Sequence, residues 1–185
     1  MKPSLRLILC LTIISFAMIS VAWTPWGAIY DSARDERSVG DQAIDKQISL
    51  SIKSKLADRD TKMALKVHVY CFMRHVYLIG AIDDTTFRGF AVGTATTTKD
   101  VKEVIKYFVS ETDTLTADLA VATKVRAMLI ADKNLSSTQV ETEVANGEVI
   151  MVGMVRDKAD AELAINIAKG VEGVRKVTTF LTPPQ

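Results

Sequence analysis

Cysteine is nearly absent from this sequence, whose 185 residues include only Cys10 and Cys71. Cys10 lies in an N-terminal apolar run that we predict is removed, which leaves one cysteine and excludes an intramolecular disulfide. Each folded unit must therefore rest on its own hydrophobic core. Cys71 lies on a predicted strand at a position that matches Val144 of a second, similar strand. We therefore interpret it as a buried structural thiol.

An excess of charge of one sign is also lacking. The sequence has 23 basic and 22 acidic side chains. Removal of Lys2 and Arg6 with the N-terminal segment leaves 23 − 2 = 21 basic against 22 acidic side chains. A nearly neutral chain has no global field that attracts nucleic acid, so we predict no nucleic-acid partner.

Catalytic motifs are missing as well. The sequence contains no glycine-rich phosphate loop, no nucleophile elbow and no HExxH pattern. Asp83-Asp84 and Asp157 follow the two predicted hairpins, where carboxylates commonly cap the next helix, and we interpret them as caps. We predict a protein that is not an enzyme and has no cofactor.

His68, Cys71 and His75 are the residues that best suggest a metal site. Strand alternation places His68 and Cys71 on opposite faces of their strand, however, and no carboxylate lies close by in sequence to complete a ligand set. We therefore predict no metal site.

The N-terminus has the pattern of a secretory signal peptide. Lys2 and Arg6 precede the uncharged run Leu7–Ala22, which ends in the small residues Ser20-Val21-Ala22. We predict cleavage after Ala22 and a periplasmic location, with an uncleaved inner-membrane anchor as the alternative. Cys10 lacks the small preceding residues of a lipidation site. Residues 23–40 are expected to form a linker or arm.

Gln139–Gly153 is the clearest structural pattern in the sequence. Val140, Thr142 and Val144 alternate with glutamates, which predicts a strand with one buried face. Asn146-Gly147 accepts the positive φ angles of a type I′ turn, and Glu148–Val152 supplies the returning strand. The stretch is predicted to be a β-hairpin.

This pattern occurs twice, at an offset of 73 residues without a gap. The helical stripe and its counterpart are Ile44, Ile48, Ile52, Leu56 and Ala117, Val121, Val125, Leu129. We predict the α+β class, with two tandem αββαβ modules at 41–109 and 116–182 joined by a linker at 110–115. Each module is expected to have a three-stranded mixed sheet covered on one face by two helices.

Several motifs resemble those of the dual BON-domain envelope proteins. They are DERSVGDQ at Asp35–Gln42, TKVRAML at Thr123–Leu129, NGEVIMVG at Asn146–Gly153 and GVEGVRKVTT at Gly170–Thr179. The resemblance implies a non-enzymatic periplasmic protein of envelope and osmotic stress that supports outer-membrane integrity. It covers almost the whole mature chain.

The resemblance also implies binding to an anionic phospholipid surface through the first helix of the second module, Ala117–Ile130. The lipid-binding residues carried over are Leu119, Ala120, Lys124, Arg126, Met128 and Lys133. Ala120 stands where an aromatic side chain that inserts into lipid is expected. The alternative is a solvated helix face whose cations only aid solubility.

A protein interface on the first module is the second functional hypothesis. Apolar Phe72 and Met73 lie at a turn beside Arg74, where a partner or the neighbouring module is expected to cover them. Gly89 and Gly93 would let another backbone approach the second helix. The partner would be an envelope protein, such as an assembly machine, or a second copy of the chain. The alternative is that the first module is simply less stable.

Overall fold

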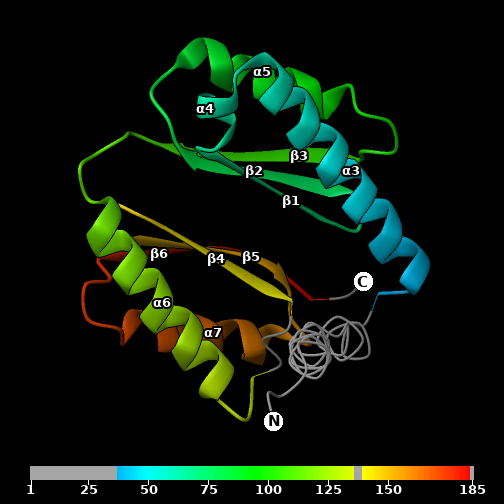
Figure 1. Cartoon of the computed structure of the whole chain (residues 1–185). Helices are drawn as coiled ribbons and strands as arrows, with labels where there is room; N and C mark the ends of the chain where they lie inside the picture. The colour runs from blue at the N-terminus through cyan, green and yellow to red at the C-terminus, as the bar shows by residue number, and fades with distance from the viewer. Residues whose placement is uncertain (1–36, 136–138, 184–185) are drawn as a thin grey trace, which may run out of the picture. The chain divides into compact units, whose positions relative to one another are not determined.

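The computed structural model of the chain describes residues 37–135 and 139–183 (Figure 1). The two predicted modules belong to one compact unit, and we call them repeat one and repeat two. The predicted signal peptide at 1–22, with its Cys10, and most of the predicted arm lie outside the described residues.

Repeat one is a mixed three-stranded sheet with helices on one side. Its elements are α3 (Val39–Arg59), α4 (Thr61–Ala64), β1 (Val67–Phe72), β2 (His75–Ala81), α5 (Thr85–Thr96) and β3 (Glu103–Val109). The strand order is β1-β2-β3, with β1 antiparallel and β3 parallel to the central strand. Figure 1 shows α3 and α5 on the same side of this sheet. The short helix α4 is an addition to the predicted plan.

Repeat two has the same plan. Its elements are α6 (Leu115–Ala131), β4 (Val140–Ala145), β5 (Glu148–Met154), α7 (Lys158–Lys169) and β6 (Lys176–Thr182). The strand order is β4-β5-β6, again with an antiparallel hairpin and a parallel last strand. The predicted α+β class and the two αββαβ modules are confirmed.

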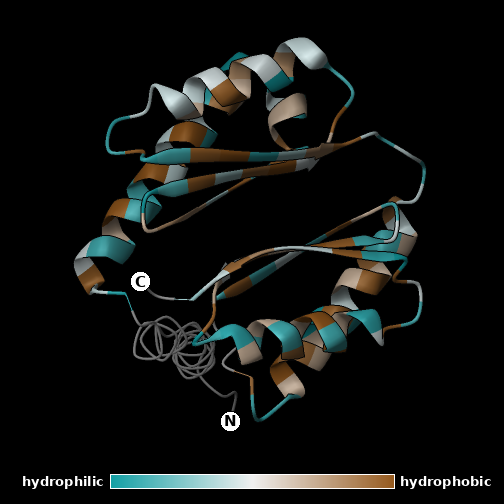
Figure 2. Ribbon diagram, turned by 180° about the vertical axis from the view of Figure 1, so that it is seen from behind, coloured by the Kyte–Doolittle hydropathy of each residue, from teal (hydrophilic) through white to brown (hydrophobic). Residues whose placement is uncertain are grey.

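Each repeat buries the predicted helical stripe against its own sheet. Ile52 of α3 and Val76 of β2 are fully buried in one core, and their counterparts Val125 and Val149 are fully buried in the other. Figure 2 shows hydrophobic residues along the strands of both sheets. Two small cores of the same design explain why the alternation of apolar residues recurs at a fixed offset.

The predicted caps are present at the start of α5 and α7. Asp84 accepts a hydrogen bond from the backbone N–H of Phe87 at 2.8 Å, and Asp157 accepts one from that of Asp160 at 2.9 Å. Both carboxylates therefore satisfy helix donors that would otherwise lack a partner.

A third apolar cluster joins the two repeats through the sheet faces that the helices leave free. It contains Phe72, Tyr77, Ile79, Ile150, Val152 and Met154. The ring of Phe180 lies 6.1 Å from that of Tyr77 and 5.8 Å from that of Tyr107, measured between centroids. Repeat two therefore covers the apolar side chain of Phe72, which is 8% exposed.

Candidate functional site

The hairpin turn of repeat two is held by a buried carboxylate on α6. Asp118 accepts hydrogen bonds from the backbone N–H groups of Asn146 and Gly147, both at 2.8 Å. These residues have φ angles of 57° and 69°, as a type I′ turn requires. Thr114, the residue before α6, donates its hydroxyl to the same carboxylate at 2.6 Å. The helix is thereby fixed against the end of the hairpin.

Repeat one contains the same arrangement. Asp45 on α3 accepts hydrogen bonds from the N–H groups of Met73 at 2.9 Å and Arg74 at 2.8 Å. These two residues adopt φ angles of 52° and 69°, although neither is glycine or asparagine. Asp45 and Asp118 are 73 residues apart, so the self-comparison contained this signal, but the sequence reasoning followed only the apolar stripe and missed it.

Asp45 also affects the protonation of Cys71, the cysteine that lies within the described residues. The Cys71 thiol donates to a carboxylate oxygen of Asp45 at 3.3 Å, and Arg37 pairs with the same carboxylate at 2.7 Å. Burial raises the pKa of the Cys71 thiol, and the negative charge of Asp45 raises it further. The thiol is therefore protonated and enclosed.

The outer face of α6 is unusually apolar for a solvent-facing helix. Leu115 is 80% exposed, and three further large apolar side chains are Leu119 at 65%, Met128 at 53% and Ile130 at 69%. Exposed large apolar side chains that gather on one element mark an interaction surface. Leu115, Leu119 and Ile130 lie within about 60° of one another around the helix axis, and we call them the apolar face of α6, whereas Met128 lies on the opposite flank.

The matching helix of repeat one, α3, exposes Val39 and Leu50, but at positions that do not correspond to these. At the offset of 73 residues, the positions of Leu115, Leu119 and Met128 on α6 are occupied on α3 by Gln42, Lys46 and Lys55. The difference cannot come from the fold, because both helices cover equivalent sheets. The difference is therefore specific to α6.

The predicted cations of α6 lie on two flanks of the helix. Lys124 is one turn from Met128 and its ammonium lies 3.5 Å from a carboxylate oxygen of Glu172. Arg126 lies on the other flank and donates to the backbone carbonyl of Thr142 at 3.1 Å. Arg126 thus lies among the residues of the apolar face, and Lys124 lies beside Met128 on the opposite flank.

Two further predicted lipid-binding residues complete this surface. Ala120 is exposed on the same face of α6, and Lys133 is exposed just beyond the end of the helix. The six predicted lipid-binding residues therefore lie on one helix and its C-terminal extension, all at positions that solvent reaches.

The residues of the predicted protein interface differ in their surroundings. Phe72 is buried, whereas Met73 is 39% exposed. Gly89 and Gly93 are exposed on α5, and a Cβ atom built on either would meet nothing within 4 Å. Among the described residues, no backbone approaches these glycines as the sequence had suggested.

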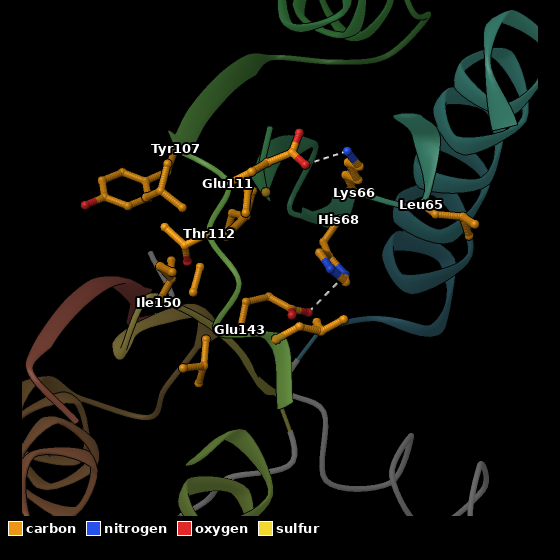
Figure 3. A pocket seen from close by; sticks show the side chains of 15 residues that line it. Leu65, Lys66, His68, Tyr107, Glu111, Thr112, Glu143 and Ile150 are labelled. Carbon is orange, nitrogen blue, oxygen red and sulfur yellow. Dashed lines mark hydrogen bonds and ion pairs between the residues drawn. The ribbon is translucent and has the colours of Figure 1, made fainter. Parts of the chain in front are cut away.

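A pocket of about 340 Å³ lies where the two repeats meet (Figure 3). Its apolar lining includes Ile79 and Ile150. Figure 3 shows His68 and Glu143 pointing toward each other, with 3.1 Å between His68 Nδ1 and the carboxylate. Lys66 and Glu111 form a second pair at 2.6 Å. The first pair links the two repeats beside the apolar lining, and the second ties repeat one to the linker between them.

Two negative findings apply to the part of the chain that the structure describes. Within 37–135 and 139–183, no helix is both long and apolar enough to cross a membrane. The same residues contain no group of three or more histidine, cysteine or acidic side chains that could hold a metal ion.

The fold and the repeated turn geometry define a class of proteins built from two tandem αββαβ modules. The family model described as BON domain matches residues 44–110 and 117–182, which is most of the described chain. The chain belongs to the BON-domain family.

Curated relatives extend this comparison. The chain is 26% identical over 148 residues to the 21 kDa hemolysin of Actinobacillus pleuropneumoniae, covering 77% of this chain and 76% of that protein. It is 25% identical over 150 residues to outer membrane lipoprotein DolP of Haemophilus influenzae, covering 78% and 77%. Over 64 residues it is 39% identical to osmotically-inducible protein Y of Escherichia coli, covering 35% of this chain and 32% of that protein.

Among solved structures, the C-terminal domain of CdsD, a structural protein of the type III secretion system of Chlamydia trachomatis, is similar with a TM-score of 0.33. The two chains are 11% identical, and the similarity covers 76% of this chain and 67% of that one. A score this low carries no functional argument.

Proposed function

We propose that this protein is a non-enzymatic envelope protein of the periplasm, which binds anionic phospholipid at a membrane surface through α6 of repeat two. The apolar face of α6, which α3 lacks, carries this proposal. The envelope location rests on the family and on the printed name of DolP as an outer membrane lipoprotein. The printed name of osmotically-inducible protein Y supports a role in osmotic stress.

The chemistry of α6 fits a helix that lies in the membrane interface. Burial of a leucine or isoleucine side chain contributes about 1.5–3 kcal/mol, so Leu119 and Ile130 would supply most of the binding free energy. Each nearby cation adds about 1 kcal/mol at an anionic surface. Lys124 would exchange its exposed partner Glu172 for a lipid phosphate, which costs little because exposed ion pairs are weak.

Vesicle co-sedimentation tests the proposal. We expect the purified protein to sediment with vesicles of phosphatidylglycerol and not with vesicles of phosphatidylcholine. The combined substitution Leu119→Ser and Ile130→Ser should abolish sedimentation without unfolding the protein, because both side chains are exposed. Leu50→Ser is the matched control, since Leu50 is exposed on α3 of repeat one.

A charge-reversal pair tests the electrostatic part separately. Lys124→Glu with Lys133→Glu should weaken binding to phosphatidylglycerol and leave the apolar face intact. Lys46→Glu with Lys55→Glu on α3 makes the same change in net charge away from α6. If the α6 and α3 double variants lose equal amounts of binding to phosphatidylglycerol, the protein responds to net charge and a site on α6 is refuted. Absence of sedimentation with either type of vesicle would refute lipid binding altogether.

A further inference from the structure

Two glycines in α5 have no structural explanation within repeat one. Gly89 and Gly93 lie inside a helix of 12 residues, and a Cβ atom on either would meet open space. A glycine inside a helix costs about 0.5–1 kcal/mol relative to alanine. Neither close packing nor a positive φ angle calls for glycine here, so their effect is to leave the surface of α5 bare.

The bare side of α5 borders a groove along β3. One hollow, of about 540 Å³, is lined by Gly89, Val92 and Lys106, and a second, of about 290 Å³, is lined by Val92, Lys102 and Lys106. The two hollows share Val92 and Lys106, so they form one groove between the helix and the strand. We call it the α5–β3 groove.

Strand β3 is an edge of its sheet. Among residues 37–135 and 139–183 it pairs with β2 alone, where Lys106 lies beside Leu78, and no described strand pairs with the backbone N–H and C=O groups on its outer side. An edge of this kind can accept an additional strand, and the added backbone hydrogen bonds supply affinity. The groove next to it would receive alternate side chains of that strand.

The charge of the groove selects the kind of strand. Lys102 and Lys106 are exposed on the helix side of β3, and their ammonium groups make no ion pair with any residue in the described part of the chain. Glu103 is the acidic residue in the lining. A second copy pairing through the same edge would bring lysines against lysines, which is unfavourable. An acidic segment is therefore the complementary occupant.

Repeat two carries different side chains at the equivalent positions. At the offset of 73 residues, Gly89, Gly93 and Lys106 correspond to Glu162, Asn166 and Thr179. The side chains of Glu162 and Asn166 are exposed on α7, where α5 has none. The bare surface of α5 is thus a property of repeat one and not of the fold.

We propose that the α5–β3 groove docks an extended acidic segment of a partner protein, which adds to the sheet of repeat one as a fourth strand beside β3. The backbone of the segment pairs with β3, and its carboxylates bind Lys102 and Lys106. Gly89, which lines the groove, keeps the helix clear of the side chains of the segment, and Gly93 leaves the next turn of the helix bare. This site is independent of lipid binding at α6.

A model peptide tests the proposal directly. The probe is a blocked heptapeptide of sequence Thr-Glu-Val-Glu-Val-Glu-Thr, titrated into the purified ¹⁵N-labelled protein, and a peptide with lysine in place of glutamate is the control. We expect the acidic peptide to shift the amide resonances of Gly89, Gly93 and β3, and the lysine peptide to shift none of them. Binding of the acidic peptide should weaken as the salt concentration rises, because salt screens the contact between its carboxylates and the lysines.

Substitutions taken from repeat two provide the matched variants. Gly89→Glu with Gly93→Asn should lower the affinity for the acidic peptide about tenfold or more, while the melting temperature is maintained. Lys106→Thr tests the charge without adding bulk and should also weaken binding. Vesicle sedimentation of both variants should equal that of the wild type, which separates this site from α6. The proposal is overturned if the acidic peptide leaves these amides unshifted, or if both variants bind it as the wild type does.

Discussion

The Oδ1 atom of Asp118 accepts a hydrogen bond from the backbone N–H of Gly147 at 2.8 Å, which ties the first turn of α6 to the hairpin of repeat two. Asp45 makes the corresponding bond to Arg74 in repeat one, also at 2.8 Å. Both carboxylates are buried. The fold therefore uses one buried carboxylate per repeat to fix the first helix against the hairpin turn.

Removal of this carboxylate should destabilise repeat two. Asp118→Ala leaves the N–H groups of Asn146 and Gly147 without their partner, and we expect the free energy of unfolding to fall by about 3 kcal/mol. Urea unfolding monitored by circular dichroism measures the change. Asp113→Ala, at an exposed position just before α6, is the control and should have an effect near zero. Equal effects would show that the turn does not depend on Asp118.

Stability should fall in acid because of two carboxylates whose pKa values are lowered. Burial raises the pKa of Asp118, but hydrogen bonds from Thr114 and from the N–H groups of Gly147 and Asn146 outweigh it, and the net pKa lies below the ordinary value. Burial also raises the pKa of Glu148. Hydrogen bonds, chiefly from Lys176, outweigh this effect, so the net pKa of Glu148 also lies below its ordinary value.

A lowered pKa in the folded state means that the unfolded state binds protons first as the pH falls. The stabilisation is complete above the unfolded pKa values of about 3.9 and 4.3, and it is lost as the pH falls through the lower folded values. We expect the free energy of unfolding to decline below about pH 4. Glu148→Gln should reduce the slope of that decline. If plots of the free energy of unfolding against pH are parallel for the wild type and the variant, Glu148 does not contribute to the decline.

The first hairpin should become more stable if it receives the turn residues of the second. Met73 and Arg74 hold positive φ angles that cost side-chain-bearing residues about 1–2 kcal/mol. Met73→Asn with Arg74→Gly reproduces the Asn146-Gly147 turn and should raise the free energy of unfolding by about 1 kcal/mol. Thermal unfolding measures it. A lower melting temperature would mean that contacts of the native side chains outweigh the backbone cost.

The elements of this fold could be predicted because they depend on local patterns. Strand alternation, the Asn146-Gly147 turn and the recurrence at 73 residues gave both hairpins and the order of elements, and the carboxylates of Asp84 and Asp157 gave two helix caps. The parallel last strand followed from the general handedness of crossover connections.

The contacts that decide function were harder to predict because they join distant elements. Nothing local in the sequence shows that Arg126 donates to the carbonyl of Thr142. The apolar turn did suggest a cover for Phe72, but it could not show whether a partner or repeat two supplies it. The buried role of Asp118 was hidden for a different reason. A carboxylate in a helical stripe resembles a solvated residue until its backbone partners are known.

Phe72 lies in the apolar cluster that both repeats share, so its substitution tests how far the repeats stabilise each other. Phe72→Ala should lower the free energy of unfolding by about 3 kcal/mol, because it leaves a cavity in the cluster that both repeats share. Its exposed neighbour provides the control. Met73→Ala should change stability by less than about 0.5 kcal/mol. A small effect of Phe72→Ala in urea unfolding would mean that the two sheets separate at little cost.

Glycine-to-alanine substitutions should have opposite signs at two positions of repeat one. A Cβ atom on Gly80 would overlap the backbone carbonyl of Lys66, so Gly80→Ala must separate β2 from the start of β1. We expect a loss of about 3 kcal/mol or more, a value typical of severe overpacking. Gly89→Ala adds a methyl group in open space on a helix and should gain about 0.5–1 kcal/mol.

The contrast between these substitutions separates the structural glycine from the one assigned to the groove. Both variants change one hydrogen into a methyl group within the same repeat, so differences in their urea midpoints report the local surroundings of each glycine. A gain in stability at Gly89 would show that the native glycine is retained at a cost to the isolated fold. A loss there would mean that the bare surface of α5 serves folding, and the groove would then need no partner to explain it.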